Sequence, residues 1–217
     1  MTVITISREL GSEGAAVAAQ VANRLGYSFV TKNNLEKILQ QYGLVQLDAL
    51  YNSTPGFWAR LDDANLQLIS MLNKVLLGIA QRGNTVILGR GGFAALNGYS
   101  DVLHIRVQAP FSLRVKRIRE REQLADIHDA EKLVSENDKA RHTFIQAFYD
   151  VADDTVNLFD LVLNTDVVST EMAVDWVCET AQAMDYGLLT DKLTTQDIEV
   201  DPILAHAIEQ VLEPAIV

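Results

Sequence analysis

A short apolar segment, a glycine-containing loop and an amphipathic helix follow one another at the start of the chain. Residues 3–6 are typical of a buried strand, the loop spans residues 7–14, and apolar residues then recur at helical spacing up to Gly26. Strand, loop and helix in this order open a βαβ unit. No other feature constrains the fold as strongly, because such a unit implies a parallel sheet.

The same alternation continues along the chain. Further strands are predicted at residues 85–88, 102–107 and 160–163, and further helices at 33–41, 62–82, 110–124, 129–148 and 169–184. Residues 42–60 have no clear pattern and contain a turn signal at Pro55-Gly56. We therefore expect an α/β protein with a mostly parallel sheet that helices cover on both faces. Ligands of such sheets bind beyond the carboxyl ends of the strands.

Composition narrows the class of protein. With 217 residues, 48% hydrophobic and 22% charged, the chain is expected to be a soluble globular protein with one main domain. Its net charge of −11 argues against a general nucleic-acid binder. No long apolar run predicts a membrane span, and the N-terminus has no basic signal region. A single cysteine, Cys178, predicts a reducing compartment, the cytoplasm, and an inert core thiol.

The C-terminal segment is predicted to be separate from the main domain. We divide the chain into residues 1–187 and an extension at 188–217. Asp201-Pro202 opens an amphipathic helix in this extension, because aspartate is a good N-cap and proline suits the first helical position. Docking of this helix on its own domain is the simpler interpretation, and a homodimer contact is the alternative.

The loop after the first strand has some features of a phosphate-binding loop. Glycines allow backbone N–H groups to curl around a phosphate, and the following helix contributes its positive N-terminus. A full P-loop continues with lysine and a hydroxyl residue, but here Gly14 is followed by Ala15 and Ala16. Glu13 adds a negative charge that would repel a phosphate if it pointed at one. By itself the motif is equally compatible with a plain turn.

Arginines gather in two later segments. Arg90 stands in a Gly-Arg-Gly-Gly turn directly after a strand, where its planar fork suits a phosphate. Arg114, Arg117 and Arg121 share one face of the helix at 110–124. A polyphosphate site is one interpretation of these residues. The alternatives are a structural ion pair for Arg90 and a solvated basic face for the helix.

One further pair and the histidines complete the candidates. Asp138 and Arg141 share a helix face, either as part of a mobile lid over a phosphate site or as a simple ion pair. The four histidines show no metal-ligand spacing, and only His142, beside Arg141, is of interest. We predict no protein metal ligand.

Taken in order, these segments resemble the cytidylate kinase-like family of P-loop proteins. The matching stretches are ITISRELGSEG, ILGRGG, HIRVQAPFSLRVKRIRERE, NDKARHTF and FDLVLNT, which lie between residues 1 and 185. The resemblance implies a P-loop NTPase-type three-layer sandwich with a five-stranded sheet and an α-helical lid. It also implies a kinase that uses ATP and Mg²⁺, with a nucleotide as substrate.

The resemblance also implies roles for individual residues. In the donor site, Arg8, Gly11, Ser12 and Gly14 would hold the phosphates of ATP. Arg90 would bind the phosphate of the acceptor, Arg114 and Arg117 would be the lid-base arginines, and Asp138 and Arg141 the lid pair. Asn164 and Thr165 match a strand-end motif that would support the sheet edge.

The sequence departs from the family pattern at informative positions. Family loops read GSGG followed by a basic residue, where this chain has Glu13 and Ala15, and the family's Tyr-Asp-Lys appears as Val30-Thr31-Lys32. Unless Arg8 or Arg114 replaces the missing cation, phosphoryl transfer would be slow. We therefore expect a nucleoside monophosphate kinase, with CMP as the first candidate acceptor. The alternative is a catalytically silent relative that acts as a nucleotide sensor or an interaction module.

Overall fold

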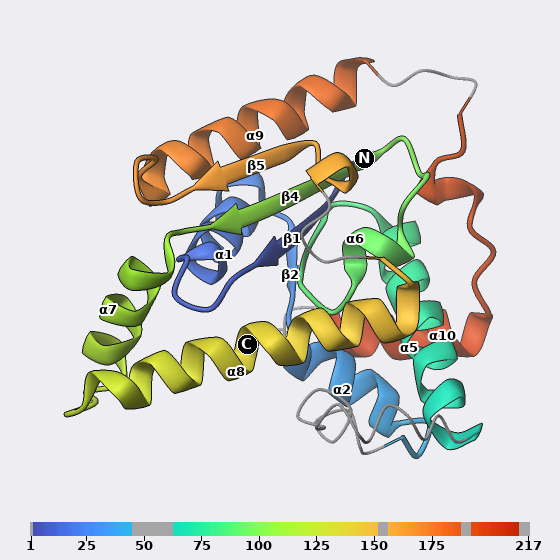
Figure 1. The fold of residues 1–217 in the computed structure, drawn as a ribbon. Coiled ribbons are helices and arrows are strands. Elements are labelled where there is room, and N and C mark those ends of the chain that lie inside the picture. Colours follow the sequence, from blue (N-terminus) through green and yellow to red (C-terminus); the bar gives the residue numbers. More distant parts are fainter. Residues whose placement is uncertain (1, 45–62, 152–155, 188–191, 213–217) are drawn as a thin grey trace.

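The five strands in the part of the chain that the structure describes run parallel in a single sheet (Figure 1). The computed structural model describes residues 2–44, 63–151, 156–187 and 192–212. The strand order is β2-β3-β1-β4-β5. The strands are β1 (Val3–Arg8), β2 (Ser28–Val30), β3 (Thr85–Leu88), β4 (Val102–Gln108) and β5 (Leu161–Asn164). β1 is the middle strand of this order, and its side chains are almost entirely buried, as expected for a strand covered on both faces.

Helices form the two outer layers, as the sequence predicts. The main helices are α1 (Gly14–Leu25), α2 (Lys32–Gln40), α5 (Asp63–Arg82), α7 (Phe111–Arg121), α8 (Ile127–Tyr149), α9 (Thr170–Gly187) and α10 (Pro202–Leu212). A one-turn helix, α6 (Gly92–Ala95), follows β3, and short 3₁₀ turns occupy Val156–Leu158 and Thr195–Asp197. The expected three-layer α/β sandwich is confirmed. None of the helices in the described ranges is long and apolar enough to cross a membrane.

Successive side chains of the strands point to opposite faces of the sheet and pack into two separate hydrophobic cores. Ile4 and Ile6 of β1 pack with α1 and α9 on one face of the sheet. Val3 lies on the other face, where α2, α5 and α10 contribute the apolar side chains. A small third cluster joins α7, α8 and Leu10, next to the loop that leaves β1. This last cluster positions α7 and α8 beyond the sheet rather than over it.

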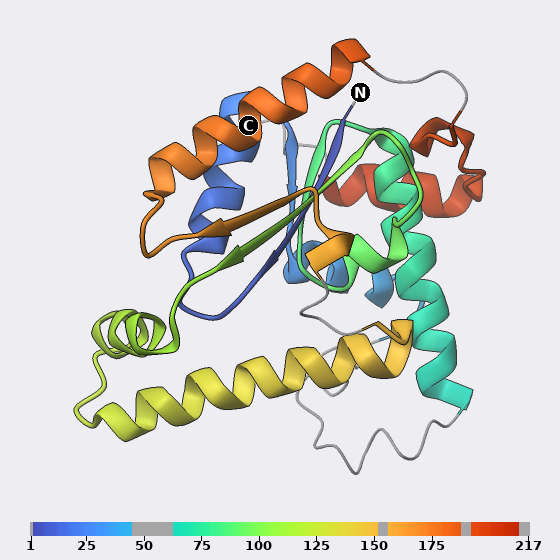
Figure 2. The same ribbon diagram turned by 45° about the horizontal axis from the view of Figure 1, so that its top comes forward.

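The two views in Figures 1 and 2 show what this means for a ligand. In both, α7 and α8 lie at the end of the sheet to which the strand arrows point. The loops after β1, β3, β4 and β5 all emerge at that same end. The carboxyl edge of the sheet and the inner side of α8 therefore face each other, in the position expected for a lid.

The periodicity located the long elements to within a few residues but missed β2. This strand is only three residues long and lies at the edge of the sheet, with a single fully buried side chain, Val30. A segment of this length has too little alternation to signal a strand. Most of the unpatterned segment at 42–60, including its predicted turn at Pro55, lies outside the described residues.

The C-terminal helix α10 begins at Pro202, as predicted, with Asp201 Oδ1 accepting hydrogen bonds from the backbone N of Ile203 (2.9 Å) and Leu204 (3.2 Å). α10 packs against α5 and α2 of its own chain. A buried pair strengthens this attachment: Thr195 donates its N–H and its hydroxyl to the carboxylate of Asp101, at 2.8 and 2.5 Å. The division at residue 187 stays a prediction.

His104 gives the fold a pH dependence that can be measured. Its ring is buried, with Nδ1 2.7 Å from the Thr5 hydroxyl, and desolvation lowers its pKa below the usual value. The unfolded chain therefore binds the proton first, so stability should fall as pH drops below about 6.5, by at most about 1.4 kcal/mol per pH unit. Urea unfolding between pH 7 and 5 should show this slope in wild type and in His206→Gln. In His104→Gln the part of this pH dependence that comes from His104 should disappear. An unchanged slope in that variant would contradict the lowered pKa of His104.

Candidate functional site

The loop between β1 and α1 is curled by two residues in the left-handed region. Gly11 has φ 83°, and a methyl group on it would lie 2.8 Å from the carbonyl oxygen of Arg114, so only glycine fits. Glu13, the N-cap of α1, has φ 62° and takes this strained conformation without a side-chain capping bond. Inside the loop, the Ser12 hydroxyl donates to the carbonyl of Glu9 at 2.8 Å. The result is a compact turn that leads into the helix N-terminus.

A cavity of about 1030 Å³ opens over this loop. It extends from the loop residues and the start of α2 across the turn after β3 to the inner side of α8. Among the described residues, its basic lining consists of Arg8, Lys32, Arg90, Arg121, Lys139 and Arg141. Its acidic lining in the same ranges consists of Glu9, Glu13 and Glu136. Basic residues thus outnumber acidic ones here, although the whole protein carries a net charge of −11.

The turn after β3 presents Arg90 to this cavity. Gly89, Arg90 and Gly91 all have left-handed backbones, with φ 71°, 59° and 73°. The two glycines are closely approached: a methyl group on Gly89 would lie 2.0 Å from Nη1 of Arg8, and one on Gly91 would lie 2.4 Å from the Tyr149 ring. Glycine is needed at both positions for space as well as for conformation. The guanidinium of Arg8 therefore lies against the turn that carries Arg90.

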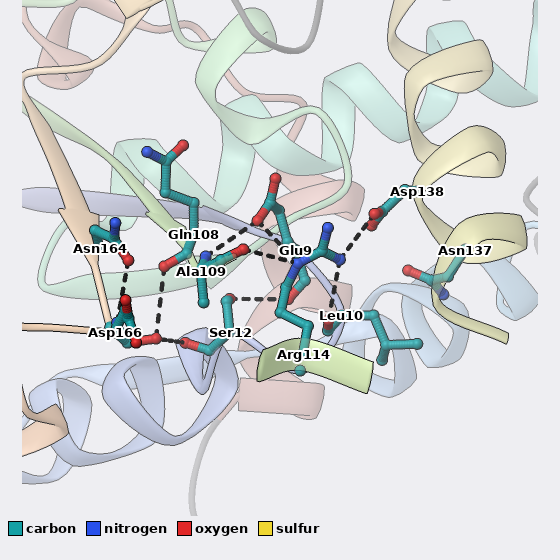
Figure 3. A network of polar contacts seen from close by, with 12 residues as sticks. Glu9, Leu10, Ser12, Gln108, Ala109, Arg114, Asn137, Asp138, Asn164 and Asp166 are labelled. Carbon is teal, nitrogen blue, oxygen red and sulfur yellow. Dashed lines mark hydrogen bonds and ion pairs between the residues drawn. The ribbon is translucent and has the colours of Figure 1, made fainter. Parts of the chain in front are cut away.

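Arg114 lies beneath the loop, away from the cavity wall, and its side chain is only 6% exposed. Its Nε donates to the Ala109 carbonyl at 3.0 Å and lies 3.2 Å from Glu9 Oε2. Its Nη1 donates to Asp138 Oδ2 at 2.8 Å and to the Leu10 carbonyl at 3.3 Å. Figure 3 shows this guanidinium between Glu9 and Asp138. In this structure Arg114 joins three segments of the chain.

Arg117, one turn further along α7, braces the loop from another side. Its Nη1 donates to the Thr165 hydroxyl at 2.9 Å and to the Gly11 carbonyl at 3.2 Å, and its Nη2 donates to the Thr165 carbonyl at 2.9 Å. The Thr165 hydroxyl in turn donates to the Ser12 carbonyl at 3.0 Å. Thr165 follows β5, so these bonds tie the loop after β1 to the far edge of the sheet.

The lid pair lies in the middle of α8. Asp138 Oδ1 is 3.4 Å from Nη2 of Arg141, and the same Nη2 donates to Asn137 Oδ1 at 2.9 Å. Arg141 reaches the cavity wall, whereas Asp138 lies behind it, between Arg141 and Arg114. His142 is exposed and does not line the cavity. Asp138 and Arg141 therefore form the intrahelical ion pair that their spacing predicts, and Arg141 of this pair lines the cavity.

The predicted site residues fall into two groups. Those that line the cavity are Arg8, Gly11, Gly14, Arg90 and Arg141. Those that lie behind it and support it are Ser12, Arg114, Arg117 and Asp138. The roles assigned to both groups stay predictions.

Sequence reasoning missed two residues that the geometry makes prominent. Lys32 lines the cavity from the first turn of α2; its match to the family's Tyr-Asp-Lys gave it no role, and its position after a strand would have marked it had β2 been recognised. Glu9 pairs with both Arg114 and Arg106, at 3.2 and 3.6 Å. No local pattern announces Glu9, because both partners are about a hundred residues away in the sequence.

Comparison with known proteins places the chain in a family. The model of the "Cytidylate kinase-like family" matches residues 3–167. The chain belongs to the cytidylate kinase-like family. It is accordingly a phosphotransferase of the nucleoside monophosphate kinase type.

Individual relatives agree with this family. The chain is 29% identical over 181 residues to a cytidylate kinase of Ignicoccus hospitalis, covering 82% of this chain and 97% of that one. It is 24% identical over 183 residues to a cytidylate kinase of Pyrobaculum calidifontis, at 82% and 94% coverage. An uncharacterised protein from Eubacterium ventriosum has the same fold, with TM-score 0.66, 19% identity and coverage of 84% and 98%.

Proposed function

We propose that this protein transfers the γ-phosphoryl group of ATP to a nucleoside monophosphate, with CMP as the first candidate acceptor. The observation that carries the proposal is the ring of basic side chains around the cavity at the carboxyl edge of the sheet. A pocket of this kind in an acidic protein selects polyanions locally while the rest of the surface repels them. The cytidylate kinase names of the relatives support CMP as acceptor.

Each group around the cavity has a part in this reaction. The curled loop at Gly11–Gly14 and the N-terminus of α1 would receive the ATP phosphates, with Arg8 in place of the missing lysine. Arg90 would bind the acceptor phosphate from the turn after β3, and Arg141 would neutralise the transferred group from α8. The acceptor is already an oxyanion and needs no general base. Positioning and charge stabilisation therefore supply the catalysis.

ATP fits this cavity in charge and size, and Mg²⁺ fits less specifically. The loop has alanines at 15 and 16 where a P-loop places its metal-binding hydroxyl. No cluster of three potential metal ligands occurs in the part of the chain that the structure describes. Mg²⁺ often keeps several waters and is held through substrate phosphates plus a carboxylate or two, so Glu13 is the loop residue available to it. The ion would supply charge neutralisation of the phosphates.

The proposal is tested by binding and turnover together. In a thermal-shift assay, ATP–Mg²⁺ and CMP should each raise the melting temperature. A coupled assay of ADP release should then identify the acceptor among a panel of nucleoside monophosphates. A thermal shift without turnover would instead favour a silent relative that senses nucleotides, consistent with the alanines at 15 and 16. If no nucleotide shifts the melting temperature, both nucleotide functions are wrong.

Glu13 should oppose ATP binding and strain the loop at the same time. Glu13→Gln removes the charge and keeps the side chain, so affinity for metal-free ATP should rise by about tenfold. Glu13→Gly should raise the affinity equally and also relieve the left-handed backbone, adding about 1 kcal/mol of stability. Calorimetric titration in EDTA and urea unfolding measure the two effects. Weaker ATP binding in both variants would show that the carboxylate helps rather than hinders.

A further inference from the structure

Glu9 is the centre of a set of charges that the proposed roles do not explain. Its Oε2 accepts a hydrogen bond from the Ala109 backbone N at 3.1 Å and lies 3.2 Å from Arg114 Nε. Its Oε1 lies 3.6 Å from Arg106 Nη2. The three side chains are 19%, 6% and 9% exposed, so their charges interact in a mostly dry environment. Ion pairs there are stronger and more directional than at the surface.

This set of charges continues to the cavity through α8. Arg114, which pairs with Glu9, also pairs with Asp138: its Nη1 lies 2.8 Å from Asp138 Oδ2 (Figure 3). The other oxygen of Asp138 lies 3.4 Å from Arg141 Nη2. The series Glu9–Arg114–Asp138–Arg141 starts where the loop after β1 lines the cavity, passes behind the cavity through Arg114 and Asp138, and returns to the cavity wall at Arg141 on α8. It is a physical connection between the phosphate-binding loop and the lid helix.

The geometry also shows how the connection is held in one orientation. Arg114 donates to the carbonyls of Ala109 and Leu10 as well as to the two carboxylates. Its fork is therefore fixed by acceptors on opposite sides. If Glu9 lost its charge, Asp138 would be the one carboxylate left on Arg114 among the described residues, and its second oxygen would be drawn away from Arg141.

We propose that Glu9 is a positioning residue. Its carboxylate orients Arg114, Arg114 orients Asp138, and Asp138 holds Arg141 at the cavity wall, so that loop and lid move as one unit. The inference rests on the proposed phosphoryl transfer for its effect on turnover. Its effect on α8 itself holds whether or not the protein proves to be an active kinase.

Steady-state kinetics of Glu9→Gln, Asp138→Asn and the double variant provide the first test. Each single variant should lower kcat by about tenfold or more, with KM for ATP within about threefold of wild type. The double variant should be about as slow as the slower single one, because both changes break the same chain. Asp175→Asn is the control: it removes the carboxylate on α9 that forms an exposed ion pair with Arg24 on α1, and it should leave kcat and KM unchanged. Losses that multiply, or a rise in KM alone, would overturn the proposal.

Amide hydrogen exchange of α8 without nucleotide provides the second test. In Glu9→Gln, exchange across residues 134–142 should accelerate by about tenfold, while Asp175→Asn matches wild type. Unchanged exchange in Glu9→Gln would overturn the positioning role even if the enzyme is active. Accelerated exchange in a protein that turns over no nucleotide would leave the positioning role standing and reject the proposed function instead.

Discussion

Arg90→Ala is expected to lower kcat/KM for the acceptor by about a hundredfold or more, which corresponds to about 3 kcal/mol. The residue lines the cavity from the turn after β3, beside the guanidinium of Arg8, which packs against Gly89 of the same turn. Loss of a bidentate contact to a desolvated phosphate has an effect of this size. KM for ATP should change far less. Initial rates at varied acceptor concentration measure both quantities.

A matched control separates this role from general loss of positive charge. Arg119 lies on the exposed side of α7, where it donates to the carbonyls of Leu124 and Ala125 and does not line the cavity. Arg119→Ala should leave the acceptor kinetics unchanged. Arg90→Lys should recover only part of the loss, because lysine lacks the planar fork. Wild-type acceptor kinetics in Arg90→Ala would refute the assigned role.

Arg114→Met is expected to lower the free energy of unfolding by about 2–4 kcal/mol. The substitution keeps much of the side-chain volume but removes the cation that Glu9 and Asp138 share, and leaves the Ala109 and Leu10 carbonyls without their partner. Glu9 and Asp138, 19% and 30% exposed, would each lose one of two paired arginines and keep Arg106 and Arg141, so part of the penalty is the loss of hydrogen bonds at the two carbonyls. Urea unfolding at pH 7 should show a lower midpoint with a similar slope.

The comparison variant for this effect is Arg24→Met. Arg24 also pairs with a carboxylate, Asp175, but both side chains are about half exposed, at 47% and 49%. Solvent screens such a pair, so its loss should not move the urea midpoint measurably. Equal midpoints for Arg114→Met and wild type would contradict the view that Arg114 joins the loop to α7 and α8.

The sequence predicted the sheet and its loops well because their signals are local. The apolar run that ends at Ile6 is followed within a few residues by a glycine-containing loop and then by α1, and this local order is enough to predict a strand, a loop and a helix. The loops after β1 and β3 both line the cavity, as expected for parallel strands that end at a common edge, and that this cavity binds the ligand stays a prediction.

The helix at α7 shows where local reasoning ends. Helical spacing placed Arg114, Arg117 and Arg121 on one face, and the structure gives them three different surroundings. Arg114 is buried under the loop, Arg117 braces Thr165, and Arg121 lines the cavity. Which of them is buried depends on how α7 docks against the loop and α8, and that contact is between segments far apart in the sequence. The position of Glu9 at the centre of the charges was unpredictable for the same reason.

The central claim is that basic side chains from several elements bind ATP without the usual P-loop lysine. Calorimetric titration of ATP–Mg²⁺ into the wild-type protein and Arg8→Ala tests it directly. We predict one saturable site in wild type, and binding weakened by about tenfold or more in the variant, because Arg8 is the cavity-lining cation at the start of the loop, whereas Arg114 and Arg117 lie behind the loop. Absence of binding heat from any nucleotide, or equal affinity in the two proteins, would contradict the claim.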